Sequence, residues 1–241
     1  ALKRQQARWA QGSIETALRL IGPLLRSRQP WTVKLEGLAH LTGYVVHPLM
    51  LLTVLLTLPM SFSNSWILAV SPWLMLMAAG PPLLYLVAQT EESWRQRIRH
   101  LPLLELLGIG MALNNTWAVL KGVLGVRQAF LRTPKFALRA ANDGWVSSRY
   151  ALSAVPFVWG EVLLSLFAAT LLTLPQVNLG FVPWLLLYAG SFAYVAGVSL
   201  YQSRQRLQWL VAQPKPTPRR EGHTPASGRE CTRADCPGRH R

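Results

Sequence analysis

The chain has 241 residues, 51% of them hydrophobic, and a formal net charge of +15 at pH 7. Its apolar residues come in long runs, which is typical of membrane proteins rather than of soluble domains. The basic residues flank these runs, so we interpret the charge as a topology signal and do not expect nucleic-acid binding. The two cysteines, Cys231 and Cys236, lack the second ligand pair of a zinc site, and no metal site is expected on this chain.

Residues 1–30 are predicted to form an amphipathic helix that lies in the membrane interface. Its first turns carry Gln5, Arg8 and Trp9, and spacings of three and four residues place all three on one helix face. Arginine can bind a diphosphate with two parallel hydrogen bonds, and an indole can stack on a sugar ring. The alternative is a basic surface helix with Trp9 as an interfacial anchor.

Region 31–205 contains five apolar runs, from which we predict about four transmembrane helices in two hairpins. Runs 38–60 and 66–88 form the first hairpin, and runs 155–174 and 181–201 form the second. Each hairpin has an uncharged turn and basic flanks, which favours flanks in the cytoplasm.

The run between the hairpins, 101–124, is different because it contains Glu105, Asn114, Asn115 and Lys121. These side chains are costly against lipid. Strongly basic segments lie on both sides of the run, so a full crossing would put one of them outside. We therefore predict an in-plane or re-entrant helix, with a full span as the alternative.

Glu161 lies inside the fourth run, near its predicted cytoplasmic end. A carboxylate within a membrane is expected to line a functional cavity or channel, or else to pair with a cation. Residues 206–241 have few apolar residues and are predicted to form a disordered basic tail. The predicted fold class is an all-α membrane protein.

Segment 126–150 is predicted to be a loop at the cytoplasmic membrane surface. It contains Phe130, Thr133 and Lys135 close together, and the intervening Pro134 disfavours a helix. Lys135 and Thr133 could supply a charge and a hydrogen bond to a bound phosphate. Short basic loops are common beside membranes, so the loop alone does not indicate a function.

The two motifs together are more specific. Gln5-Gln6-Ala7-Arg8-Trp9 resembles the QxxRW signature of membrane-embedded glycosyltransferase family 2 enzymes, which include cellulose, mannan and hyaluronan synthases. Phe130-Leu131-Arg132-Thr133-Pro134-Lys135 resembles the FxVTxK gating loop of the cellulose-synthase branch, with Arg132 in place of the valine. The order of elements also resembles the family, and the likeness covers about residues 1–205.

The resemblance implies transfer of a hexose from a nucleotide-diphosphate sugar to a glycan or lipid acceptor, in one step or processively with translocation across the membrane. Trp9 would stack on the acceptor sugar, and Arg8 and Gln5 would contact the diphosphate and the acceptor end. Phe130, Thr133 and Lys135 would close over the donor nucleotide.

In this family the catalytic domain precedes QxxRW and carries a metal-binding DxD pair and a base Asp, whereas this chain has no DxD motif. We therefore expect the C-terminal membrane part of such an enzyme, truncated or separately encoded, without catalytic residues or a cofactor of its own. The full enzyme would use Mg²⁺ or Mn²⁺ with the donor sugar. We expect a bacterial inner membrane location with cytoplasmic termini and lipid contacts. The rival hypothesis is a non-catalytic membrane subunit or exporter component.

Overall fold

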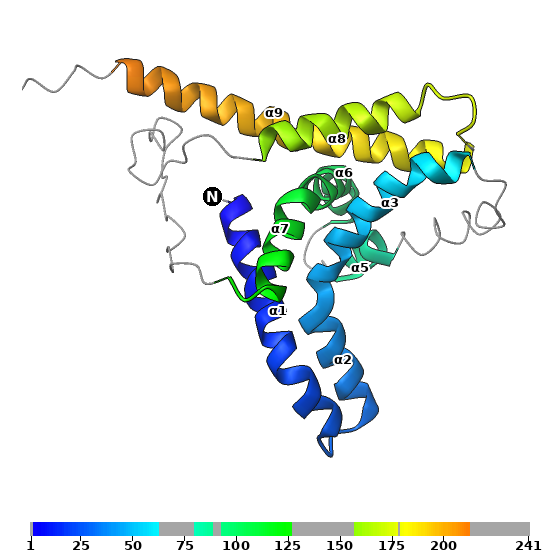
Figure 1. The fold of residues 1–241 in the computed structure, drawn as a ribbon, viewed down its shortest axis with the longest axis vertical. Coiled ribbons are helices and arrows are strands. Elements are labelled where there is room, and N and C mark those ends of the chain that lie inside the picture. Colours follow the sequence, from blue (N-terminus) through cyan, green and yellow to red (C-terminus); the bar gives the residue numbers. More distant parts are fainter. Residues whose placement is uncertain (1, 63–79, 89–92, 127–156, 178, 213–241) are drawn as a thin grey trace, which may run out of the picture.

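The computed structural model describes residues 2–62, 80–88, 93–126, 157–177 and 179–212 (Figure 1). All regular secondary structure in these ranges is helical. The prediction of an all-α protein is therefore confirmed for the described part of the chain.

Helix α1 (Leu2–Arg26) and helix α2 (Trp31–Thr42) form a hairpin at one end of the molecule (Figure 1). Helix α2 continues through the 3₁₀ turn η1 (Gly43–Val45) into α3 (Val46–Ser61). Together they make a stretch of 31 residues, Trp31–Ser61, that is long and apolar enough to cross a membrane. It is about 46 Å long at roughly 1.5 Å per residue, against about 30 Å for the hydrocarbon core of a bilayer. The predicted run 38–60 lies within it.

Two helices form the middle of the chain, α6 (Trp94–Gly110) and α7 (Ala112–Val123). Ser93 and Gln96 form a capping box at the start of α6, which satisfies backbone donors there. The axes of α6 and α7 differ by 46°, as in a broken span or a re-entrant loop. The short helix α5 (Gly80–Ala88) precedes α6 and accepts a hydrogen bond from Arg97 at Leu86 O.

Helix α8 (Val158–Leu171) and helix α9 (Val182–Ala212), with the 3₁₀ turn η3 (Leu179–Phe181), lie side by side across the other end of the molecule (Figure 1). The stretch Leu179–Ala212 is the second helix long and apolar enough to span a membrane. The described residues thus contain two candidate spans, or three if the bent pair α6–α7 is one span. Helix α9 runs to Ala212, beyond residue 206, where the sequence places the start of the tail.

Two apolar clusters hold these helices together. The larger one lies where α3, α6, α8 and α9 meet, and includes Val54, Ile109, Leu171, Leu185 and Phe192. The smaller one joins α1 to α7; its buried members are Ala10, Ile14, Ala118 and Val119. Many large apolar side chains of α3 stay exposed, among them Leu49, Leu52, Leu55 and Leu56, as expected of a helix that faces lipid.

Candidate functional site

The motif Gln5, Arg8 and Trp9 lies on the side of α1 that faces away from α7. Ala10, Ile14 and Ala17 are the buried residues of α1, and their spacing defines the stripe that packs on the bundle. At roughly 100° per residue, Gln5 and Arg8 fall on the opposite side of the helix and Trp9 falls on its flank. Trp9 is 51% exposed, whereas Gln5 and Arg8 are half-buried.

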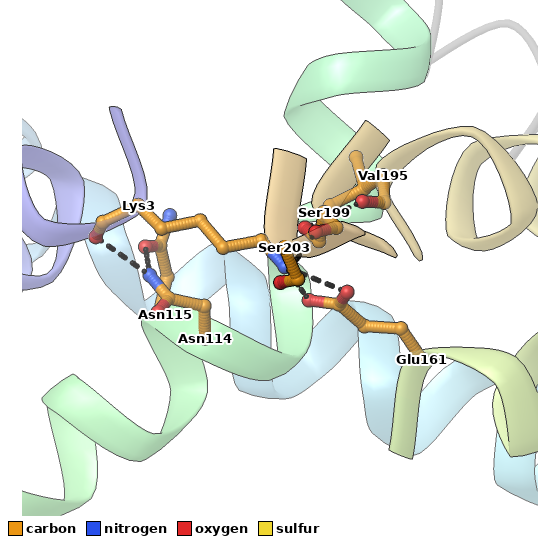
Figure 2. A network of polar contacts seen from close by, with 7 residues as sticks. All are labelled: Lys3, Asn114, Asn115, Glu161, Val195, Ser199 and Ser203. Carbon is orange, nitrogen blue, oxygen red and sulfur yellow. Dashed lines mark hydrogen bonds and ion pairs between the residues drawn. The ribbon is translucent and has the colours of Figure 1, made fainter. Parts of the chain in front are cut away.

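A buried ion pair joins the first turn of α1 to α8. Lys3 Nζ donates to both carboxylate oxygens of Glu161, at 2.6 Å and 2.7 Å (Figure 2). Glu161 is fully buried, and the Lys3 side chain is 13% exposed. The carboxylate also lies in the first turn of α8, where the helix dipole favours a negative charge. Of the roles expected for an intramembrane carboxylate, pairing with a cation is the one seen here.

The same turn of α1 is held by α7. Asn114 Nδ2 donates to the backbone oxygen of Lys3 at 3.0 Å and to Asn115 Oδ1 at 3.0 Å (Figure 2). Asn115 Nδ2 lies 2.9 Å from Nε2 of His47, on α3. Because an amide NH₂ can only donate, the His47 nitrogen is the acceptor. The two asparagines, both buried, therefore link α1 to α3 through α7.

A further link runs from α1 to the turn η1. Tyr44 Oη donates to Gln6 Oε1 at 3.1 Å, and the Tyr44 ring lies 5.8 Å from the His47 ring between centroids. We call this set of contacts the polar anchor; its residues are Lys3, Gln6, Tyr44, His47, Asn114, Asn115 and Glu161. Its two residues on α1, Lys3 and Gln6, lie on either side of Gln5 in the sequence. Lys3 precedes Ala10, the first buried residue of the apolar stripe, by about two helical turns.

Gln11 provides a polar contact on the other side of the motif. Its amide nitrogen donates to Val126 O at 2.9 Å and to Glu15 Oε1 at 2.7 Å. Val126 is the last described residue before segment 127–156, and Glu161 lies shortly after that segment. Lys3 and Gln11, which bracket the motif, thus bind the chain on both sides of the segment that contains the predicted loop.

The site residues predicted from the sequence fall into two groups. Gln5, Arg8, Trp9 and Glu161 are described, whereas Phe130, Thr133 and Lys135, with nearly all of loop 126–150, lie outside the described residues. Sequence reasoning missed Lys3 and Gln11, whose side chains bind Glu161 and Val126 on the two sides of segment 127–156. Their one signal was that both flank the motif.

Asn114 and Asn115 interrupt an apolar run, which is the signal that marks them as unusual in the sequence, and His47 likewise lies within the apolar run 38–60. The structure assigns them a common role, because all three belong to the polar anchor. Within the described ranges, no three His, Cys, Asp or Glu residues lie close enough together to hold a metal ion.

Comparison of the chain with protein-family models, with curated proteins and with solved structures finds no match in any of the three.

Proposed function

We propose that this chain is the membrane part of a glycosyltransferase family 2 enzyme and that Gln5, Arg8 and Trp9 border its sugar-transfer site. The observation that carries the proposal is the pentapeptide Gln5-Gln6-Ala7-Arg8-Trp9, set on α1 outside the buried stripe, where Trp9 is exposed and Gln5 and Arg8 are partly buried. A folded domain could approach them from that side. The contacts of Lys3 and Gln11 on both sides of segment 127–156 support it further.

Each motif residue has a chemical role in this proposal. The Arg8 guanidinium binds the diphosphate of the donor, for which its planar fork of N–H groups is suited. The exposed Trp9 indole stacks on the acceptor sugar. Gln5 donates a hydrogen bond to the acceptor end or to the diphosphate. Together these contacts hold the acceptor hydroxyl and the donor sugar close enough to react.

The reaction would be an inverting transfer. The acceptor oxygen forms a bond to the anomeric carbon, and the bond from that carbon to the diphosphate oxygen breaks. The nucleotide diphosphate leaves, and the hydroxyl proton passes to a base. That base, and the Mg²⁺ or Mn²⁺ that accompanies the donor, belong to a catalytic domain outside these 241 residues, because this sequence contains no DxD motif.

The proposal includes a topology. We assign the stretch Trp31–Ser61 and the run 66–88, of which residues 66–79 lie outside the described ranges, to one transmembrane hairpin, and α8 and α9 to the other. The bent pair α6–α7 stays on the cytoplasmic side, α1 lies in the interface, and both termini are in the cytoplasm of a bacterial cell. The hairpins would line the path of a growing glycan, or the chain would serve a single transfer to a lipid acceptor.

The test compares alanine substitutions of two tryptophans, each made in the full-length protein and assayed in membranes of the cell that produces it. Membranes containing Trp9→Ala should transfer sugar from UDP-glucose or GDP-mannose about tenfold or more slowly than wild-type membranes, at equal amounts of inserted protein. Trp94→Ala is the control, because Trp94 on α6 is similarly exposed, at 58%, and lies outside the motif. Equal transfer by wild type and Trp9→Ala would favour the non-catalytic subunit instead.

A further inference from the structure

The contact surface between α1 and α7 combines small residues with two branched side chains, Ile14 and Val119. Ala10 and Ala118 are buried in it, and a Cβ added at Gly122 would lie 3.0 Å from the backbone oxygen of Gln11. Small residues let helix backbones approach closely, and they leave Ile14 and Val119 as the large buried side chains of this contact. Directional polar contacts restrict the rotation of one helix against the other further.

The polar contacts of α1 restrict its rotation at two points. Lys3 reaches α8 through both carboxylate oxygens of Glu161, and its backbone oxygen accepts from Asn114 of α7. Gln11, two turns further on, donates to Val126 O just after α7. The motif Gln5, Arg8 and Trp9 lies between these two points. Any rotation or sliding of α1 that moved the motif would break at least one of the contacts.

A buried ion pair is a poor way to gain stability alone, since desolvation of both charges offsets much of their attraction. Buried polar groups can instead specify one arrangement among several, as polar residues do in setting the register of paired helices. The bidentate geometry at Glu161 defines the direction from which Lys3 must approach. This suits a register-setting role better than a packing role.

We propose that Lys3, through Glu161, and Gln11, through Val126, are positioning residues that hold the motif of α1 in the orientation required for sugar transfer. This inference rests on the proposed function for its link to activity. The claim that the ion pair sets the orientation of α1 depends only on the described contacts and can be tested without substrate.

The first experiment measures the orientation of α1 directly. Spin labels are attached to Gly12→Cys on α1 and Leu163→Cys on α8, two exposed positions, in a background with Cys231→Ser and Cys236→Ser. In reconstituted full-length chain, Lys3→Met should shift or broaden the distribution of distances between the two labels. Lys3→Arg, which keeps the charge, should leave that distribution unchanged. Glu161→Gln should reproduce the effect of Lys3→Met. Unchanged distributions in Lys3→Met and Glu161→Gln would overturn the inference.

The second experiment measures transfer in native membranes with UDP-glucose or GDP-mannose. Displacement of Arg8 should raise the donor KM at least fivefold in Lys3→Met, and Lys3→Arg should restore it. A loss of folded protein would lower the maximal rate and leave KM unchanged, so an unchanged KM would assign the ion pair a structural role only. Gln11→Ala should raise KM in the same direction, by a smaller factor, because it removes a single neutral hydrogen bond to Val126.

The outcomes separate the two proposals. If Trp9→Ala abolishes transfer but Lys3→Met changes neither KM nor the spin-label distances, the function stands and the positioning inference fails. If Lys3→Met shifts the distances but Trp9→Ala transfers sugar like wild type, the proposed function fails while the ion pair still sets the orientation of α1.

Discussion

Gly122 of α7 lies directly against Ile14 of α1. A Cβ atom added at Gly122 would lie 3.1 Å from Ile14 Cβ, closer than ordinary van der Waals contact. The two helices therefore approach to a distance that requires a residue without a side chain at position 122. The orientation of the motif helix depends on this contact as well as on the polar anchor.

This contact predicts a disulfide. Cysteines at Ile14 and Gly122 would bring two Cβ atoms to about the 3.5–4.5 Å separation of a disulfide after a small shift. In a background with Cys231→Ser and Cys236→Ser, mild oxidation of native membranes should cross-link Ile14→Cys/Gly122→Cys nearly completely. The product can be read as a shift in electrophoretic mobility that a reductant reverses.

The matched control for the cross-link is Leu18→Cys/Gly122→Cys. Leu18 lies one turn further along α1, but it is exposed and outside the buried stripe. It should cross-link little under the same conditions. Equal yields from the two pairs would contradict the packing of α1 on α7.

Two glycines of α6 predict opposite effects of the same substitution. A Cβ at Gly110 would overlap with the backbone oxygen of Ser191 and with Val195 Cγ2, both on α9, whereas a Cβ at Gly108 meets nothing within 4 Å. Gly110→Ala should lower the free energy of unfolding by about 1–3 kcal/mol, the cost of overpacking. Gly108→Ala should be neutral or should raise it by up to about 1 kcal/mol through helix propensity. Unfolding by sodium dodecyl sulfate in mixed micelles, followed by circular dichroism, measures both. The prediction is wrong if the two variants unfold alike.

Composition and the length of the apolar runs were enough to predict the helical structure of the described residues and the presence of helices long enough to span a membrane. The run 38–60 lies inside the helical stretch Trp31–Ser61, because apolar length is a local property that a sequence displays directly. The 46° bend between α6 and α7 was harder to predict from the sequence, because the residue at the bend is Met111 and not a proline. The extent of α9 to Ala212 was missed because its last turns carry Arg204 and Arg206 and resemble a polar tail.

The polar anchor could be predicted only in part. Glu161 in an apolar run indicates a need for a cation, but many basic residues of this chain could supply it. The actual partner, Lys3, is 158 positions away in the sequence. Pairing over such a separation depends on how α1 packs against α7 and α8, and no local pattern encodes it. The helix face shared by Gln5, Arg8 and Trp9, by contrast, follows from spacing alone.

The buried amide of Asn115 predicts a loss of stability when it is removed. Asn115 accepts from Asn114 and lies 2.9 Å from His47 Nε2, so Asn115→Ala would leave buried polar atoms of both neighbours without this partner. The expected loss is about 1–3 kcal/mol in the free energy of unfolding. Thr53→Ala is the control, because Thr53 is exposed and its hydroxyl donates to Leu49 O of its own helix; it should change stability by less than about 0.5 kcal/mol. A cost for Asn115→Ala as small as that of the control would argue against the anchor.

The proposed topology predicts the side from which the loop is reached. Thr133 lies outside the described residues, in the segment between α7 and α8. If α6–α7 enters and leaves the membrane on the cytoplasmic side, a cysteine at Thr133 should react with a membrane-impermeant maleimide in inside-out vesicles and not in intact cells. Asn64 also lies outside the described residues, in the uncharged segment after Ser61. A cysteine at Asn64 should show the reverse, because the proposed first hairpin places that segment outside the cell. Labelling of both cysteines from the cell exterior would make α6–α7 a full span. That result would move the Phe130–Lys135 loop to the side of the membrane away from nucleotide sugars and would remove its proposed role at the donor.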